Sequence, residues 1–387
     1  MRSFALPVLL VTVFATFVVV TPPAQAATCG GARATVLGTD KDDNLVGTAR
    51  RDVIVGLGGD DFLDGRGGDD IICGGDGRDT LSGGSGSDRL SGGRGEDQLD
   101  GQKGNDRLEG GNSRDALFPL SDPGIDVFDG GRGLDELNFL DADEAVTVDL
   151  SEGFVRMGDR REQLVGGTFE IVTGSEFADK LVGDDDDNVL FAGFASRGDE
   201  ILGNGGNDYL EGYDGSKALN GGEGDDVISG IGRGDAIDGG GGTDLIRMCG
   251  SFSVSVNVCT GGSPGDEGVK ADLGKGTITG YVEATFAGIE AFEGTASADE
   301  LVGSGGADAL FGGPREDILV GGEGDDLLWG DTPAPLPPSI ANRLGPSQLG
   351  EAERNDDLNG GPGTDSLDGD GGTDTCTNGE DNKDCES

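Results

Sequence analysis

Polar and apolar positions along this chain follow a period of nine residues. From Gly38 to Phe118 the period runs nine times without slippage, with glycine in the first place, aspartate in the sixth and leucine or isoleucine in the eighth. A period this strict over so many copies is not typical of an ordinary globular core. It predicts an array of stacked repeats.

The same pattern divides the chain into arrays and inserts. Only Asn188 and Lys217 break the aspartate rule, and only Cys376 breaks the apolar rule in the eighth place. The predicted segments are a first array (27–138), an insert (139–173), a second array (174–247), an insert (248–293), a third array (294–331), a Pro-rich loop (332–350) and terminal repeats with a cap (351–387).

The two inserts resemble one another. The first contains Val148–Gly153, the second contains Ala271–Gly276, and each leads back into an array through an Ala-Asp-x-Leu-Val-Gly segment. Alternation over Phe252–Val258 predicts a strand. We therefore expect solenoid turns with longer loops, because each insert is too short for a separate catalytic domain. The stretch Pro333–Pro338 predicts a stiff linker.

The copies match Gly-Gly-x-Gly-x-Asp-x-aliphatic-x, best seen in Gly74–Ser82. This pattern resembles the RTX family of calcium-binding β-rolls. The resemblance implies an all-β chain, a parallel β-roll or β-solenoid of nonapeptide repeats interrupted by two related β-rich inserts. It also implies that the first six residues of a copy form a turn, that the last three form a short strand, and that two copies make one coil.

The residue types of the repeat favour calcium independently of the resemblance. Glycines allow left-handed backbone conformations that turn carbonyl oxygens toward one point. The following carboxylate completes an all-oxygen environment, which suits Ca²⁺ better than Mg²⁺. Coils stack about 4.8 Å apart, so we expect ions between turns one coil apart, pairing Asp61 with Asp79 or Asp70 with Asp88. The predicted ligands of several Ca²⁺ ions are Asp61, Asp70, Asp79, Asp88, Asp97, Asp106, Asp208, Asp226, Asp244, Asp308, Asp326, Asp365 and Asp374.

An alternative role for these aspartates is to cap turns by accepting hydrogen bonds from nearby backbone amides. Like charges in register at coil spacing favour a cation instead. The two interpretations are balanced where other residues degrade the glycine pattern, at Asp115, Asp126, Asp299 and Asp317. Calcium is least expected at the opening copies, which hold Lys41 and Arg50 in the fourth place, and around Lys217.

The amino-terminal segment is typical of a secretory signal peptide. An apolar run from Phe4 to Val20 precedes Ala24-Gln25-Ala26, so we expect cleavage near Ala26 and a secreted, extracellular protein. A membrane anchor fits less well because the run is short, and no later segment predicts a membrane span. The net charge of −48 disfavours nucleic acid and anionic lipid as partners and favours cations.

Six cysteines in an exported chain favour disulfides. Six cysteines allow 15 complete pairings. Proximity in sequence suggests Cys249 with Cys259 and Cys376 with Cys385, which leaves Cys29 with Cys73. Free thiols are the alternative. A bond between Cys376 and Cys385 would close the last coil against fraying.

The composition argues against catalysis. The chain has no histidine, which excludes the zinc-protease helix motif and any Ser-His-Asp arrangement, and it contains no Gly-x-Ser-x-Gly elbow. We therefore expect a non-enzymatic protein that folds on extracellular Ca²⁺ and acts as a structural or adhesive module. The alternative is a carbohydrate-binding or enzyme-associated accessory protein, like the repeat modules of polysaccharide epimerases, with an extracellular polysaccharide or cell-surface component as partner. The tyrosines and the tryptophan of this chain, Tyr209, Tyr213, Tyr281 and Trp329, are too few and scattered for a sugar-binding ladder.

Overall fold

The structure is a computed structural model that describes residues 27–119, 124–194, 198–212, 218–248, 268–331, 356–369, 374–379, 381–383 and 385. All regular elements in these ranges are β-strands. No helix in the described ranges has the length and apolar character needed to cross a membrane. The predicted signal peptide, the strand Phe252–Val258, the Pro-rich loop 332–350 and the pair Cys249 and Cys259 lie outside the described residues.

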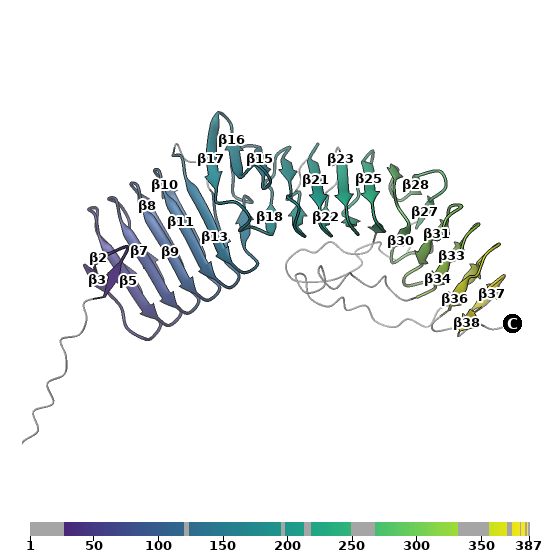
Figure 1. Cartoon of the computed structure of the whole chain (residues 1–387), viewed down its shortest axis with the longest axis horizontal. Coiled ribbons are helices and arrows are strands. Elements are labelled where there is room, and N and C mark those ends of the chain that lie inside the picture. The colour runs from purple at the N-terminus through teal and green to yellow at the C-terminus, as the bar shows by residue number, and fades with distance from the viewer. Residues whose placement is uncertain are drawn as a thin grey trace, which may run out of the picture.

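The chain winds into a solenoid whose coils alternate between two facing sheets (Figure 1). One sheet, which we call the continuous sheet, holds sixteen strands in sequence order. These are β4 (Asn44–Val46), β6 (Phe62–Asp64), β8 (Thr80–Ser85), β10 (Gln98–Lys103), β12 (Ala116–Leu117), β14 (Glu136–Asn138), β18 (Ile171–Thr173), β20 (Val189–Phe191), β22 (Tyr209–Glu211), β24 (Val227–Ser229), β26 (Leu245–Arg247), β30 (Ala291–Glu293), β32 (Ala309–Phe311), β34 (Leu327–Trp329), β36 (Ser366–Asp368) and β38 (Asp381–Lys383).

The facing sheet, which we call the interrupted sheet, is parallel except at the two inserts. Its strands are β3 (Val36–Leu37), β5 (Val53–Gly58), β7 (Ile71–Asp76), β9 (Arg89–Arg94), β11 (Arg107–Asn112), β13 (Val127–Arg132), β15 (Val146–Asp149), β16 (Phe154–Met157), β17 (Arg160–Leu164), β19 (Lys180–Val182), β21 (Glu200–Gly205), β23 (Ala218–Glu223), β25 (Ala236–Gly241), β27 (Val269–Asp272), β28 (Thr277–Gly280), β29 (Ala284–Ala287), β31 (Glu300–Val302), β33 (Ile318–Val320), β35 (Asp357–Asn359) and β37 (Thr375–Thr377). A short antiparallel pair, β1 (Thr28–Cys29) and β2 (Ala32–Arg33), precedes it.

Strand pairing follows the repeat directly. Leu63 pairs with Leu81 and Leu81 pairs with Leu99, so partners are two copies apart and each coil contains two copies. The eighth-place side chains of both sheets point inward and form one apolar cluster that runs from Ile54 to Leu367. Because one aliphatic residue per copy fills the interior, the solenoid has a narrow core and a long surface. The predicted parallel β-solenoid is confirmed.

The two inserts add an antiparallel strand to the interrupted sheet. In space the order at the first insert is β13, β17, β16, β15, β19, with β16 antiparallel to both neighbours. The second insert repeats this arrangement with β29, β28 and β27 between β25 and β31. The sequence predicts longer loops at these places and does not reveal the strand reversal.

The inserts also bend the solenoid. At the first insert the continuous sheet passes directly from β14 to β18, whereas the interrupted sheet contains two more strands than one coil needs. Each extra strand widens that sheet by about 4.8 Å, so the coils on either side splay apart there. The solenoid is an arch, with β16 and β17 on its convex side (Figure 1).

A second apolar row lies on the outer surface of the continuous sheet. Most of its members occupy the seventh place of their copies between β18 and β32, with Phe311 in the ninth place, and they include Val189, Tyr209 and Val227, each 0% exposed. Beside them Arg247 forms an ion pair with Glu293, at 2.6 Å between Nε and Oε2. The first array lacks this row, since the corresponding Phe62 is 44% exposed.

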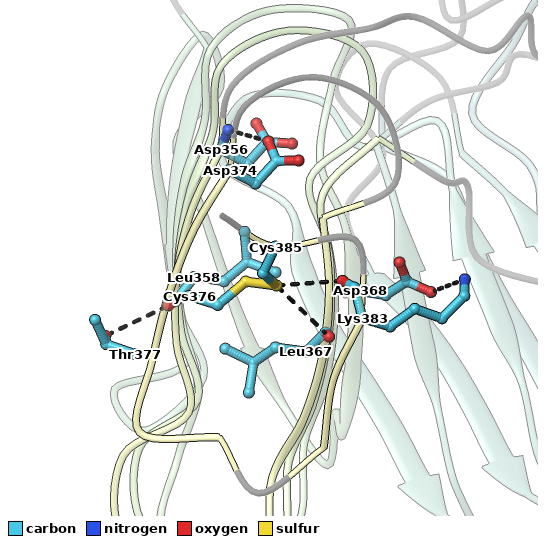
Figure 2. The surroundings of a disulfide bond; sticks show 9 residues. All are labelled: Asp356, Leu358, Leu367, Asp368, Asp374, Cys376, Thr377, Lys383 and Cys385. Atoms are coloured by element: carbon cyan, nitrogen blue, oxygen red, sulfur yellow. Dashed lines mark hydrogen bonds and ion pairs between the residues drawn. A yellow bond between two sulfur atoms is a disulfide. The ribbon is translucent and has the colours of Figure 1, made fainter. Parts of the chain in front are cut away.

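Disulfides lie at both ends of the solenoid. Cys29 bonds to Cys73, which joins β1 to β7, and the Cα atoms are 5.9 Å apart. Cys376 bonds to Cys385, with Cα atoms 5.7 Å apart, beside Leu358 of the preceding coil (Figure 2). Both predicted pairs are confirmed, and no described cysteine is free.

Candidate metal sites

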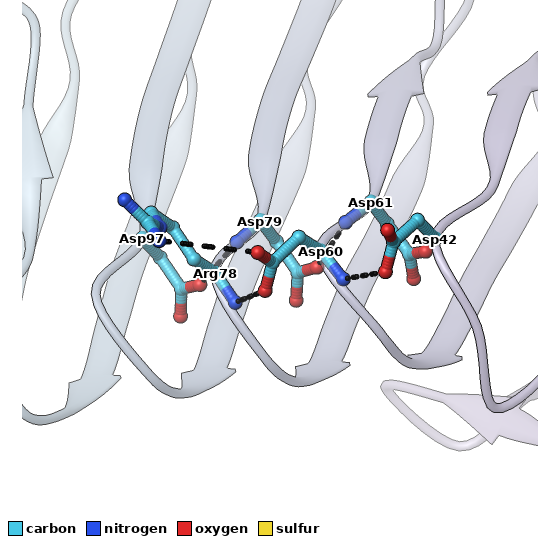
Figure 3. Close-up of polar contacts among 6 residues, drawn as sticks. All are labelled: Asp42, Asp60, Asp61, Arg78, Asp79 and Asp97. Carbon is cyan, nitrogen blue, oxygen red and sulfur yellow. Dashed lines mark hydrogen bonds and ion pairs between the residues drawn. The ribbon is translucent and has the colours of Figure 1, made fainter.

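The sixth-place aspartates form rows along the turns of the solenoid. In each row the Oδ1 atom of one aspartate accepts a hydrogen bond from the backbone N–H of the sixth residue one coil earlier. The N–H of Asp61 donates to Asp79 at 2.9 Å and that of Asp79 donates to Asp97 at 2.8 Å (Figure 3). A second row on the opposite edge joins Asp70 to Asp88 in the same way, at 2.7 Å. The structure therefore places the predicted partners in adjacent turns.

The second carboxylate oxygen, Oδ2, has no protein partner in many of these residues. A buried polar atom without a partner costs free energy, and a buried negative charge costs more unless a cation compensates it. We call these carboxylates uncapped. They are Asp61, Asp70, Asp79, Asp88, Asp97, Asp115, Asp135, Asp208, Asp226, Asp244, Asp317 and Asp326.

The first-place glycine leaves room beside each uncapped oxygen. A Cβ atom added to Gly83 would lie 2.6 Å from Oδ2 of Asp88 and 2.7 Å from the carbonyl oxygen of Gly101, one coil further on. The carboxylate and a carbonyl oxygen thus converge where any side chain would collide. No three acidic or thiol side chains of the described residues surround a common point, and the carbonyl oxygens beside the first-place glycines are the further donors that the structure supplies. Such an oxygen donor set fits Ca²⁺.

The raised pKa values of the buried aspartates indicate that their ionised forms need a positive charge nearby. Burial raises the pKa of Asp97 to about 7 and that of Asp115 to about 8. The hydrogen bond from the preceding coil opposes this rise, while neighbouring carboxylates add to it. The pKa of Asp317 rises to about 9 for the same reasons. Ionised side chains in these rows require a cation to be stable near neutral pH.

A different group of sixth-place aspartates is capped by the second residue of its own copy. Ser175 donates its N–H to Oδ2 of Asp179 at 2.6 Å, and its hydroxyl contacts both carboxylate oxygens at 2.9 Å. Thr295 and Ser304 do the same for Asp299 and Asp308. The opening copies follow the same arrangement, with Thr39 on Asp43 and Thr48 on Asp52.

The predicted ligands divide between these groups. Most of them are uncapped, whereas Asp308 is capped. Three further predicted ligands take part in the rows as acceptors. Asp106 accepts the N–H of Asp88 at 2.7 Å, and Asp365 accepts the N–H of Asp326 at 3.0 Å. Asp374 accepts the N–H of Asp356 at 2.8 Å. Of the positions where sequence leaves ligand and cap balanced, Asp115 and Asp317 are uncapped and Asp299 is capped. Asp126 accepts the N–H of Asp106 at 2.7 Å, and Lys217 lies outside the described residues.

Two features of the rows escape sequence reasoning. The first is a parallel ladder in the fifth place, where Asp42 accepts the N–H of Asp60 and Asp60 accepts that of Arg78, at 3.0 and 2.9 Å (Figure 3). The second is a glutamate in the sixth place at each insert, Glu170 and Glu290, which accepts the N–H that an aspartate accepts elsewhere. The sequence signal for these glutamates is their spacing. Each lies two residues before a buried apolar residue and four residues before a glycine.

Comparison with known protein families identifies the repeat. A family model described as the RTX calcium-binding nonapeptide repeat (4 copies) matches more than half of the chain. The matched residues are 37–72, 46–81, 74–108, 82–117, 164–196, 195–228, 285–314, 311–332 and 352–382. No curated protein matches the sequence.

Proposed function

This chain belongs to the RTX family, whose nonapeptide repeats bind several Ca²⁺ ions, and from this premise we propose that it is secreted, folds on extracellular Ca²⁺ and works as a structural or adhesive module without catalysis.

The observation that supports this function is the row of buried, uncapped carboxylates at coil spacing. Two unit charges about 4 Å apart repel by about 4 kcal/mol at an effective dielectric constant of about 20. Every coil of an array adds such a neighbour, and the narrow core contributes one aliphatic side chain per copy. Calcium between adjacent turns converts each repulsion into two attractions, so the ion decides whether an array folds.

Secretion is supported by the amino-terminal segment and by the disulfides at the two ends of the solenoid. The apolar run Phe4–Val20 followed by Ala24–Ala26 is typical of an export signal. Disulfides such as Cys29–Cys73 and Cys376–Cys385 persist in oxidising compartments. Calcium is also abundant outside cells, so a chain exported unfolded would fold at its destination.

A structural or adhesive role fits the outer surface better than sugar binding does. Stacking on a sugar needs a row of exposed aromatic rings. Tyr209 is fully buried, Trp329 packs edge-on against Phe311, with ring centroids 5.1 Å apart, and the exposed Tyr281 lies just after β28 of the interrupted sheet. The carbohydrate-binding accessory role, with an extracellular polysaccharide as partner, is therefore the outcome that a binding experiment has to exclude.

The test uses the mature chain purified with its disulfides intact. Far-UV circular dichroism and size-exclusion chromatography in chelator and in millimolar calcium should report an expanded, weakly structured chain and a compact β-rich one, respectively. A β-rich, compact protein in chelator that calcium does not change would overturn calcium-induced folding. A glycan array and a cell-surface binding assay, each with and without calcium, separate the two roles, because selective glycan binding would replace the structural role.

A further inference from the structure

We propose that Glu170 and Glu290 are calcium ligands that extend the rows into the two inserts, each completing one additional Ca²⁺ site, with Asp135 and with Asp244 respectively. This inference rests on the proposed calcium-dependent function and names two sites that the repeat pattern does not contain, because neither glutamate belongs to a Gly-Gly-x-Gly-x-Asp copy.

The two glutamates hold identical positions in the solenoid. Each lies directly before a strand of the continuous sheet, Glu170 before β18 and Glu290 before β30. The Oε2 atom of Glu170 accepts the N–H of Asp135 at 2.8 Å, and that of Glu290 accepts the N–H of Asp244 at 3.1 Å. These are the bonds that the Oδ1 atoms of sixth-place aspartates accept in ordinary coils.

The longer side chain matches a shorter turn. In the second insert Phe286 pairs with Ile237 and Phe292 pairs with Ile246, so both occupy eighth places although they are closer in sequence than one copy. The backbone is accordingly drawn toward the previous coil, where Glu290 donates its own N–H to the carbonyl of Asp244 at 3.2 Å. Glu170 donates to Asp135 in the same way, at 3.2 Å. The additional methylene of glutamate restores the reach of the carboxylate.

A second observation, independent of the glutamates, points to a ligand. Asp135 and Asp244 are both 0% exposed, and the Oδ2 atom of each has no hydrogen-bond partner. A Cβ atom added to Gly239 would collide with the carbonyl oxygen of Gly288 and lie 2.6 Å from Oδ2 of Asp244. At the first insert a Cβ on Gly130 would likewise meet a carbonyl oxygen.

That carbonyl belongs to Thr168, and the same Cβ would lie 2.8 Å from Oδ2 of Asp135. At both inserts, therefore, a buried uncapped carboxylate and a carbonyl from the insert converge next to a glycine, with a glutamate in the same turn. This oxygen set is the one that suits Ca²⁺ in the arrays. The carboxylate pair supplies two negative charges, which one Ca²⁺ ion neutralises.

The rows end at these glutamates. Beyond Glu170 the next sixth-place residue is Asn188, whose Oδ1 accepts the N–H of Asp184 at 2.8 Å. Beyond Glu290 it is Asp308, which Ser304 caps. The N–H of each glutamate is donated to the carbonyl oxygen of the aspartate one coil earlier. Each insert thus closes one calcium row, and the residue after it starts the next row with a capped turn.

The experiment compares two double variants of the full mature chain. Glu170→Gln with Glu290→Gln removes both charges but keeps an oxygen that can accept the N–H of Asp135 or Asp244. Glu152→Gln with Glu283→Gln is the matched control, because it changes one exposed glutamate in each insert. Equilibrium dialysis against calcium counts the bound ions, and circular dichroism at saturating calcium checks the fold.

We expect the first double variant to bind about two fewer ions than the control. Equal numbers and equal affinities in the two variants would overturn the inference and leave calcium-dependent folding intact. An unaltered chain that binds no calcium would instead overturn the proposed function, and this inference with it.

If the glutamine variant does not fold, the unaltered protein supplies the decisive measurement. A crystal structure grown in calcium should contain an ion about 2.3–2.6 Å from Asp135 Oδ2, Thr168 O and a Glu170 oxygen. Well-ordered turns without an ion at that point would overturn the inference.

Discussion

The second residue of each copy decides whether the sixth-place carboxylate is capped. Before every uncapped aspartate that residue has a positive φ, as at Gly75 (126°), and the same holds where it is Leu57 (84°) or Asn204 (78°). Before the capped aspartates it is threonine or serine, none of which has a positive φ. In the left-handed conformation the second N–H does not reach Oδ2, which leaves that oxygen for a cation. One side chain per copy thus separates an uncapped turn from a capped one.

Asp97→Asn should weaken calcium binding in the first array. Asp97 has neighbours on both sides of its row, so the loss of its charge affects the turns before and after it. The calcium concentration needed for half-maximal folding should rise about tenfold, or about 1.4 kcal/mol, in a titration followed by circular dichroism. Asp76→Asn is the control, because that side chain is exposed and pairs only with Arg94 at the surface. Equal midpoints for the two variants would show that Asp97 is not a ligand.

Thr295→Val should destabilise the third array without changing the number of bound ions. The hydroxyl of Thr295 donates to the buried carboxylate of Asp299 at 3.0 and 3.1 Å. Its loss should cost about 1–2 kcal/mol, measured by urea unfolding in saturating calcium, while the exposed Thr285→Val serves as the control. A change in calcium stoichiometry would contradict the assignment of this turn as capped.

At the scale of elements, the ends of the solenoid and the two inserts are the places where the repeat cannot stabilise itself. A terminal coil has a neighbour on one side only, so its strands would fray without a further constraint. Cys376 stands in the eighth place, stacked on Leu358, and its bond to Cys385 brings the chain back across the end of the core. At the inserts, β16 and β28 pair in the antiparallel sense and keep the backbone groups of the interrupted sheet hydrogen-bonded through the bend.

The double variant Cys376→Ser, Cys385→Ser should loosen the C-terminal coils alone. Closing a loop of this length contributes about 2–3 kcal/mol. Amide hydrogen exchange in calcium should therefore accelerate in β35–β37 and stay unchanged in β5–β7, where Cys29–Cys73 is intact. Uniform acceleration along the whole chain would show that the terminal bond stabilises the entire solenoid and not only its end.

At the scale of the whole molecule, calcium and protons compete for the same carboxylates. Burial raises the pKa of Asp79 to about 6 and that of Asp208 to about 8, from an ordinary value of 3.8. A carboxylate with a raised pKa in the folded state holds its proton more tightly there than in the unfolded chain. Its contribution to stability is fully present below the ordinary pKa and is lost as the pH rises through the raised value.

The calcium-free protein should accordingly be more stable in weak acid than near neutrality. Between about pH 8 and pH 4 its β-sheet content should therefore rise as the pH falls, since the folded chain holds protons on these carboxylates more tightly than the unfolded chain does. Calcium reverses the trend, because binding requires ionised ligands. Far-UV circular dichroism of the calcium-free protein at pH 5 and pH 8 tests this. More β-sheet at pH 8 than at pH 5 would contradict it.

The sequence by itself determined the repeating part of this protein. A nine-residue period with one inward aliphatic side chain per copy predicts stacked coils of two copies each, in which Leu81 lies between Leu63 and Leu99. The calcium-binding character followed from glycine and aspartate at fixed spacing. All of these features depend on residues within one copy or one coil, so the local pattern contains the information.

Only the tertiary structure decided what happens where the period is interrupted. Three features of this kind are the pairing of Asp135 with Glu170 and of Asp244 with Glu290, the reversal of β16, and the burial of Tyr209. None of them follows from the nine-residue spacing. The sequence likewise did not decide whether Asp115 and Asp299 are metal ligands or turn caps, because both copies have the same aspartate in the sixth place. Their difference lies in the direction of one backbone N–H and in one hydroxyl group, and the folded turn fixes both.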